Sequence, residues 1–147
     1  MIDSCDILVI DFQNMLHRAR SGFSKGEHAL TFTFFRMLRK VVADFSPKRT
    51  VIVLEGHPQR RHLLLESYKQ GRQSPGDDFW RQQDDIVRIL NLMPVEILKH
   101  PEHEADDVIA HAVNEMYSQK RCIVISSDAD FIQLLDQKMN AEEPFKL

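Results

Sequence analysis

Acidic residues follow the apolar runs of the sequence, and a further acidic group opens a predicted helix. Asp11 comes directly after the run Ile7–Ile10, and Glu55 comes directly after Val51–Leu54. Such runs are typical of buried parallel strands, whose carboxyl ends meet at one edge of a sheet. We therefore expect the acidic side chains to gather at that edge. The full set comprises Asp11, Glu55, Glu104, Asp106, Asp107, Asp128 and Asp130.

A cluster of carboxylates indicates a site for divalent cations. Two carboxylates about 4 Å apart repel each other by roughly 4 kcal/mol at an effective dielectric of about 20, so cations or protons must neutralise them. Oxygen ligands without neighbouring Cys or His favour Mg²⁺ or Mn²⁺ over zinc. One or two such ions suit phosphodiester hydrolysis, because a bound water loses its proton more easily and a second ion stabilises the leaving oxygen. We find no convincing Ser/His/Asp or Cys/His nucleophile.

Each acid also has a simpler interpretation. An acidic residue in the first turn of a helix complements the helix dipole, which by itself would account for Glu104 or Asp107. A single Asp after a strand is often only a turn residue. The coincidence of acids at several independent strand ends on one edge favours the metal site.

Hydrophobic periodicity predicts strands and helices that alternate along the chain. The predicted strands are Ile7–Ile10, Thr50–Leu54, Pro94–Leu98 and Arg121–Ile125. The predicted helices span 28–45, 60–69, a segment that Asp77 or Asp78 caps, 104–117, and a short stretch that ends at Leu135. Alternation of this kind indicates a single α/β domain with three layers and a mainly parallel sheet. We expect the domain at 1–138 and a tail at 139–147.

Some buried positions follow from the same periodicity. In the helix after Asp77, the predicted buried face consists of Phe79, Gln83, Ile86 and Leu90. In helix 104–117, the predicted stripe comprises Ala105, Val108, Ile109, Ala112, Val113 and Met116. For Phe32, Phe34 and Phe35, packing in the core is favoured over a stacking platform for bases.

The composition is that of an ordinary globular domain. Of the 147 residues, 43% are hydrophobic and 28% are charged. Every apolar run is too short to cross a bilayer, and the acidic N-terminus lacks the basic region of a signal peptide. Cys5 and Cys122 lie in strand-like runs and are predicted to be buried free thiols, which fits a reducing cytoplasm.

The charge is segregated along the chain. A net charge of −3 argues against a general nucleic-acid-binding surface. Residues 57–72, however, carry one acid, Glu66, and the basic residues Arg60, Arg61, Lys69 and Arg72. This segment is either a solvated helix face or a contact surface for phosphates, and its composition favours neither interpretation.

Two strings and several shorter segments occur in an order that is specific. The strings are E-A-D-D-V-I-A at 104–110 and S-S-D-x-D-F-x-Q-L-L at 126–135, and the shorter segments are Ile7–Asp11, Leu16–Ala19, Val51–Gly56 and Tyr68–Arg72. In these segments the sequence resembles the 5′ nuclease or flap-endonuclease family, which has a PIN-like fold. The family includes the 5′–3′ exonuclease domain of bacterial DNA polymerase I and the phage 5′–3′ exonucleases. The resemblance covers nearly all of Ile7–Gln137.

The resemblance implies a role for each candidate residue. Asp11, Glu55, Glu104 and Asp106 would hold a first Mg²⁺ or Mn²⁺ ion with Asp107 close by, and Asp128 and Asp130 would lie between this ion and a second one. Lys69 and Arg72 would be catalytic, contacting the scissile phosphate at the base of a helical arch. The implied nucleic-acid-binding residues are Arg18, Arg20, Arg60, Arg61, Tyr68, Lys69 and Arg72, with Tyr68 either packing against a base or filling the arch.

The sequence departs from the family pattern in two places. Glu55 stands where the family usually has Asp, which moves the carboxylate farther from the backbone. The chain also ends soon after Leu135, whereas family members continue into a helix–hairpin–helix segment that grips duplex DNA and into further aspartates. We therefore expect an incomplete second metal site and weak duplex affinity, in a truncated protein or in one whose remaining part is on a separate chain.

The function favoured by these observations is metal-dependent hydrolysis of DNA at 5′ ends or flaps, with RNA in hybrids as a further substrate. The resemblance implies a bacterial or phage-encoded protein of the cytoplasm that has no membrane partner. Two alternatives stay open: a catalytically deficient fragment that binds nucleic acid or docks on a partner, and a small PIN-type ribonuclease. The segments Tyr68–Arg72 and Ser126–Leu135 fit the DNA enzymes better.

Overall fold

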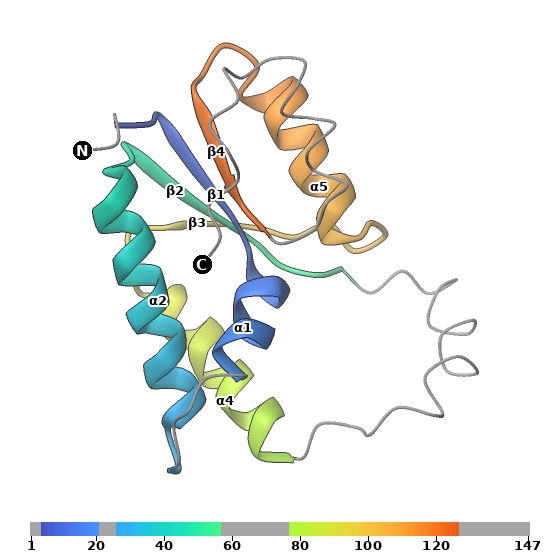
Figure 1. Cartoon of the computed structure of the whole chain (residues 1–147). Coiled ribbons are helices and arrows are strands. Elements are labelled where there is room, and N and C mark those ends of the chain that lie inside the picture. Colours follow the sequence, from blue (N-terminus) through green and yellow to red (C-terminus); the bar gives the residue numbers. More distant parts are fainter. Residues whose placement is uncertain (1–3, 21–25, 57–76, 127–147) are drawn as a thin grey trace.

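A computed structural model describes residues 4–20, 26–56 and 77–126 of the chain (Figure 1). Within these ranges, one parallel sheet contains β1 (Ile7–Asp11), β2 (Arg49–Val53), β3 (Glu96–Leu98) and β4 (Cys122–Ile125). The strand order is β3-β2-β1-β4, so the first strand of the chain lies inside the sheet. All four predicted strands are confirmed, with bounds that shift by no more than two residues.

Helices cover both faces of the sheet. One face carries α1 (Phe12–Arg20), α2 (Ala29–Phe45) and α4 (Asp77–Leu90), and the other carries α5 (Ala105–His111), continued by the π-helical turn η1 (Ala112–Met116) (Figure 1). Alternate residues of a strand point to opposite faces. Leu8 and Ile10 of β1 accordingly pack with α1, α2 and α4, while Ile7 and Val9 pack with α5. The predicted three-layer arrangement with a parallel sheet is confirmed.

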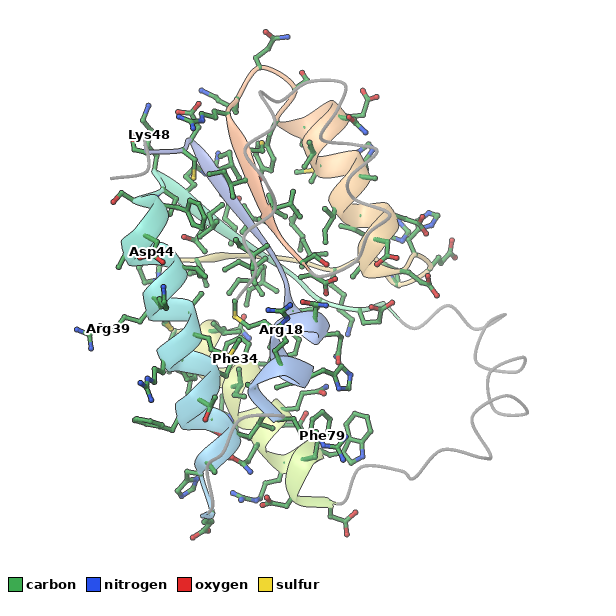
Figure 2. All side chains as sticks on the ribbon, in the orientation of Figure 1. Arg18, Phe34, Arg39, Asp44, Lys48 and Phe79 are labelled. Atoms are coloured by element: carbon green, nitrogen blue, oxygen red, sulfur yellow. The ribbon has the colours of Figure 1, made fainter. Side chains whose placement is uncertain are left out.

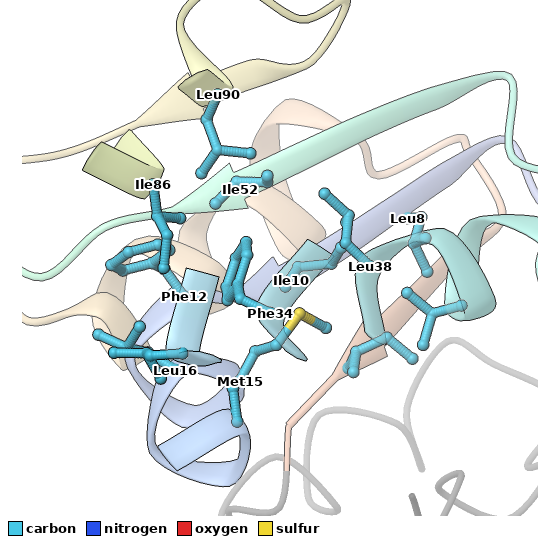
Figure 3. Packing of buried hydrophobic residues seen from close by; sticks show 14 of the residues in the cluster. Leu8, Ile10, Phe12, Met15, Leu16, Phe34, Leu38, Ile52, Ile86 and Leu90 are labelled. Atoms are coloured by element: carbon cyan, nitrogen blue, oxygen red, sulfur yellow. The ribbon is translucent and has the colours of Figure 1, made fainter. Parts of the chain in front are cut away.

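Helix α1 follows β1 without a connecting loop, and it is absent from the predicted elements. Its buried residues Phe12, Met15, Leu16 and Ala19 recur at helical spacing (Figure 3). The stripe packs against the same core as α2 and α4. The helix therefore fixes the direction of the chain immediately after Asp11.

Gln82 joins α4 to the start of α2. It is 3% exposed. Its Oε1 accepts hydrogen bonds from the backbone N–H and the hydroxyl of Thr31 at 3.1 and 3.3 Å, and its Nε2 donates to Asp78 at 2.9 Å. Thr31 is in the first turn of α2, where N–H groups have no partner within the helix, and the side chain of the N-cap residue His28 makes no capping hydrogen bond. Gln82 therefore takes the buried position predicted for Gln83, which is partly exposed.

Replacing Gln82 by alanine is expected to lower the free energy of unfolding by about 1–3 kcal/mol, because the Thr31 N–H loses its acceptor. Urea denaturation followed by circular dichroism measures this change. Gln83→Ala is the matched control, since the buried Oε1 of Gln83 accepts no hydrogen bond from the described residues. Its expected effect is within about 0.5 kcal/mol. Equal losses in the two variants would contradict the capping role of Gln82.

A π-helical turn corrects the prediction for the end of helix 104–117. The backbone N–H of Tyr117 donates to the carbonyl of Ala112, five residues earlier, at 2.8 Å. The extra residue in this turn rotates the side chains that follow it around the helix axis. Tyr117 is consequently buried, whereas Met116, predicted to be buried, is 51% exposed. The Tyr117 hydroxyl also donates to Glu96 on β3 at 3.0 Å, which attaches the turn to the edge strand.

The predictions for two thiols and three phenylalanines are tested directly. Cys5 and Cys122 are buried free thiols, as predicted, and burial raises the pKa of both, that of Cys122 to about 11. Phe34 is fully buried and Phe35 packs against the core, whereas Phe32 is 65% exposed. Among the described residues, no helix is both long enough and apolar enough to cross a membrane.

Candidate metal centre

Four acidic side chains come from the carboxyl-terminal edge of the sheet. Asp11 is the last residue of β1, and Glu55 follows the end of β2 by two positions. Glu104 is the N-cap residue of α5, and Asp106 is in the first turn of that helix. Because the strands are parallel, their carboxyl ends lie at the same edge, where α5 also begins (Figure 1). The topology therefore brings these acids to one side of the domain.

Asp11 is held from two directions. The residue is only 7% exposed. One carboxylate oxygen accepts a hydrogen bond from the backbone N–H of Asn14 in α1 at 3.3 Å, and the other accepts one from the hydroxyl of Ser126 at 3.3 Å. The bond from Asn14 resembles a helix N-cap, so the simple interpretation of Asp11 as a residue at a turn also holds. Ser126 was not a candidate site residue from the sequence, although it opens the string at 126–135 and lies directly after β4.

Glu55 lies beside the start of α5. Its Oε1 accepts a hydrogen bond from the backbone N–H of Ala105 at 3.3 Å. Partial burial raises the pKa of Glu55, the bond from Ala105 opposes this rise, and the negative charges of Glu104, Asp11 and Asp106 add to it. Charges must be near neighbours to shift a pKa in this way. The Glu55 carboxylate is therefore repelled by each of the other three carboxylates across a short distance.

Within the described ranges, the structure does not bring three or more Asp, Glu, His or Cys side chains to coordination distance of a common point. This is compatible with the mutual repulsion, because repulsion acts over several ångströms, whereas Mg²⁺ requires ligand oxygens at about 2.0–2.1 Å. The donors at this edge, four carboxylates and the Ser126 hydroxyl, are hard oxygen ligands. Their chemistry fits Mg²⁺ or Mn²⁺.

Of the other predicted metal ligands, the structure describes Asp107 alone. Asp107 is exposed in the first turn of α5, and its charge is not among those that raise the pKa of Glu55. Its position also fits the helix-dipole interpretation. Asp128 and Asp130 lie outside the described residues.

Arg18 and Arg20 are the two predicted nucleic-acid contacts that the structure describes. Both are on α1, which begins directly after β1 and leads away from the sheet (Figure 1), and Figure 2 labels Arg18 on this helix. Arg20 is exposed, and its guanidinium lies 5.1 Å from the ring centroid of Phe79 on α4. His17 stacks on the same ring, with the centroids 5.9 Å apart. The remaining predicted contacts, Arg60, Arg61, Tyr68, Lys69 and Arg72, lie outside the described residues.

Replacing Glu55 by glutamine is expected to stabilise the metal-free protein at neutral pH. Because the pKa of Glu55 is raised above its ordinary value of 4.5, the folded state binds more protons than the unfolded state between the two values. The stability of the wild type therefore falls as the pH rises through this window, and glutamine, which cannot ionise, removes that fall.

Thermal unfolding in EDTA at a series of pH values measures the difference between the two proteins. The advantage of Glu55→Gln should be small below the ordinary pKa and should grow above it. Glu115→Gln, at an exposed position of η1, is the control for the loss of a surface charge. A difference between wild type and Glu55→Gln that stays constant with pH would contradict the assigned repulsion.

A parallel sheet covered by helices on both faces, with acidic side chains gathered at its carboxyl-terminal edge, defines a PIN-like domain with a candidate centre for divalent cations. The chain belongs to the family described as "5′-3′ exonuclease, N-terminal resolvase-like domain", whose model matches residues 6–144. The resemblance stated from the sequence is thereby confirmed.

Several curated proteins are similar to this chain. A 5′-3′ exonuclease of Mycoplasmopsis pulmonis is 27% identical over 90% of this chain and 46% of its own length. The flap endonuclease Xni of Psychromonas ingrahamii is 27% identical over 95% of this chain and 57% of its own length. The chain therefore spans about half the length of these relatives.

Solved structures show the same fold. One is a bacteriophage T5 flap endonuclease in a pseudo-enzyme-product complex with DNA and metal ions. Its TM-score is 0.72 at 17% sequence identity, and the matched region spans 91% of this chain and 53% of the T5 chain. The T5 5′-exonuclease with bound divalent zinc ions has a TM-score of 0.71 at 18% identity, with the same coverage. At these identities the likeness establishes the fold alone.

Proposed function

We propose that this domain holds one or two Mg²⁺ or Mn²⁺ ions at its acidic edge and hydrolyses DNA phosphodiesters at 5′ ends or flaps. The observation that carries the proposal is the gathering of Asp11, Glu55, Glu104 and Asp106 at one edge of the sheet, where the other three charges raise the pKa of Glu55. Family membership, the named activities of the relatives, and the DNA and metal ions of the T5 complex support it. The chain spans about half the length of those relatives. Their named activities belong to whole proteins, so we assign such an activity to this protein only as part of the proposal.

The first ion would be held by carboxylates that the fold has already oriented. Asp11 is anchored by the Asn14 N–H and the Ser126 hydroxyl, and Glu55 is anchored by the Ala105 N–H. Hydrogen bonds to ligand side chains reduce the freedom that they lose on binding a cation. A bound ion supplies a water of lowered pKa and positive charge beside the phosphate. Neutralisation of the clustered charge would favour binding further.

The second ion and the phosphates would involve residues outside the described ranges. Asp128 and Asp130 would extend the acidic set toward a second ion, as the resemblance implies. Lys69 and Arg72 would bind the scissile phosphate and stabilise the charge that develops on it. Contacts with phosphates release counterions, so DNA binding should weaken as the salt concentration rises.

Cleavage assays with several substrates test the proposal. The substrates are a 5′-flap DNA, a single-stranded DNA, a flap with an RNA strand and a single-stranded RNA, each with Mg²⁺ or Mn²⁺. Cleavage of the DNA flap that both Asp11→Ala and Asp128→Asn abolish would support the proposal. Preferred cleavage of single-stranded RNA would favour a PIN-type ribonuclease. Metal binding without cleavage of any substrate would favour a catalytically deficient binding fragment.

Lys69→Ala is expected to slow cleavage by about a hundred- to a thousandfold, the usual effect of removing one group that stabilises transition-state charge. The affinity for Mn²⁺ should stay unchanged, because Lys69 is not a proposed ligand. Lys48→Ala is the matched control, since Lys48 pairs with Asp6 at 3.0 Å at the amino end of β1. An equal loss of cleavage and of Mn²⁺ affinity in Lys69→Ala would refute the assigned role.

A further inference from the structure

We propose that Gly56 is a positioning residue that sets the spacing between Glu55 and the acids at the start of α5. This inference rests on the proposed function. It adds to the proposed metal site a glycine that would not bind the ion but would fix the spacing of residues that do. Gly56 directly follows Glu55 and is buried. Its effect on the site would be exerted through the backbone of the loop that leads into α5.

Gly56 lies against the backbone of the segment between β3 and α5. A Cβ built on Gly56 would lie closer than 3.0 Å to the carbonyl oxygens of both His100 and His103, and 3.2 Å from the carbonyl carbon of His100. Real Cβ atoms essentially never come within 3.0 Å of a heavy atom outside their own residue and its two chain neighbours. Both obstructing groups belong to the backbone, so no side-chain rotation can relieve the contact. Only glycine allows the two segments to lie this close together.

Two hydrogen bonds flank this contact and connect the same two segments. On one side, the backbone N–H of Leu54 donates to the carbonyl of Leu98, at the end of β3, at 2.8 Å. On the other side, the backbone N–H of Ala105 donates to the carboxylate of Glu55 at 3.3 Å. Gly56 therefore lies between two hydrogen bonds that join the segment after β2 to the end of β3 and to the start of α5.

The loop itself has internal contacts that resist displacement. The backbone N–H of Glu102 donates to Nδ1 of His100 at 3.1 Å. The rings of His100 and His103 also lie against each other, with centroids 4.4 Å apart. A methyl group at position 56 would therefore displace the loop together with the start of α5, or it would displace Glu55. Either movement changes the distance between Glu55 and the pair Glu104 and Asp106.

A change in that distance affects a metal site strongly. Ligand distances are confined to about 0.2 Å around their preferred values. Substitutions that misplace ligands without removing them typically lower metal affinity by about ten- to a hundredfold. We therefore expect Gly56→Ala to bind Mn²⁺ about ten- to a hundredfold more weakly than the wild type, although every carboxylate is still present.

The test combines Mn²⁺ titration by calorimetry with amide hydrogen exchange of the metal-free protein. Gly56→Ala should show the weaker Mn²⁺ binding and faster exchange of the Ala105 N–H, while the amides of β1 stay protected. Gly26→Ala is the matched control, because a Cβ there meets nothing within 4 Å but its φ of +138° strains the backbone. That variant should lose stability and keep its Mn²⁺ affinity. Wild-type Mn²⁺ affinity in folded Gly56→Ala would overturn the inference.

A second variant keeps the inference testable if Gly56→Ala does not fold. Insertion of one glycine between His100 and Pro101 lengthens the loop while position 56 stays a glycine, and it should also weaken Mn²⁺ binding about tenfold. Unchanged affinity in that variant would overturn the positioning role while leaving the proposed function intact. Failure of the wild type itself to bind Mn²⁺ would refute the proposed function, and this inference with it.

Discussion

Replacing Asp11 by asparagine is expected to reduce cleavage by about a hundred- to a thousandfold while leaving the fold intact. Asparagine has nearly the same shape and can still accept a hydrogen bond from the Asn14 N–H. It lacks the negative charge that the proposed metal site requires. Loss of one group that acts on transition-state charge typically removes about 3–4 kcal/mol, which corresponds to this change in rate.

The same substitution should have the opposite effect on stability without metal. The charge of Asp11 contributes to the raised pKa of Glu55, so its removal lowers that pKa toward the ordinary value and relieves repulsion in the folded state. Asp11→Asn should therefore unfold at a higher temperature than the wild type in EDTA at neutral pH. Added Mn²⁺ should stabilise the wild type more than the variant, because ligands that bind only the folded state raise its stability.

Asp44→Asn is the matched control for Asp11→Asn. Asp44 makes an exposed pair with Lys40 at 2.8 Å near the end of α2 (Figure 2). This end of α2 lies at the amino end of β1, where the carbonyl of Phe45 accepts a hydrogen bond from the Cys5 N–H. Cleavage by Asp44→Asn should equal that of the wild type, and its stability should change by about 0.5 kcal/mol or less. Comparable cleavage by Asp11→Asn and wild type would remove Asp11 from the proposed site.

Replacing Phe34 by alanine is expected to lower the free energy of unfolding by about 3–5 kcal/mol. Phe34 is fully buried between the sheet and the helices of one face (Figure 3). Its ring lies 5.4 Å from the rings of both Phe12 and Phe35. A loss of this size is a large fraction of the roughly 5–15 kcal/mol by which domains are stable. The variant should therefore unfold at a markedly lower temperature than the wild type.

Phe32→Ala provides the comparison on the same helix. Phe32 is 65% exposed, and its replacement should change stability by no more than about 0.5 kcal/mol. Guanidinium denaturation of both variants measures the difference. Phe34 also supports the site, because it packs against Phe12, the residue after Asp11. Similar stability losses in the two variants would contradict the distinction between core and surface on α2.

Helix α1 was not predicted from the sequence, although its buried residues have helical spacing. Phe12, Met15, Leu16 and Ala19 have helical spacing, but the helix begins at the residue after β1 and its start carries no acidic residue in the first turn. The boundary therefore lacks the usual turn signal between a strand and a helix. The predictions that Gln83 and Met116 are buried were wrong for related reasons. Periodicity can assign the buried face of a helix with an error of one residue. A π-helical turn also changes which residues after it face the core, and no short pattern in the sequence marks such a turn.

The sequence by itself determined the order of the strands, the order of the described helices other than α1, and the acidic character of the strand ends. Apolar runs and helical spacing are local properties, and parallel strands necessarily place their carboxyl ends together. The pattern of residues along the chain is therefore sufficient to assign Asp11, Glu55, Glu104 and Asp106 to one edge of the sheet.

Only the tertiary structure decided what holds these acids in place. Ser126 contacts Asp11 from 115 positions away, and the Ala105 N–H reaches Glu55 from 50 positions away. The requirement for glycine at position 56 likewise comes from carbonyl groups of a distant loop. Such partners depend on how the packed elements approach one another in space, which no spacing along the chain encodes.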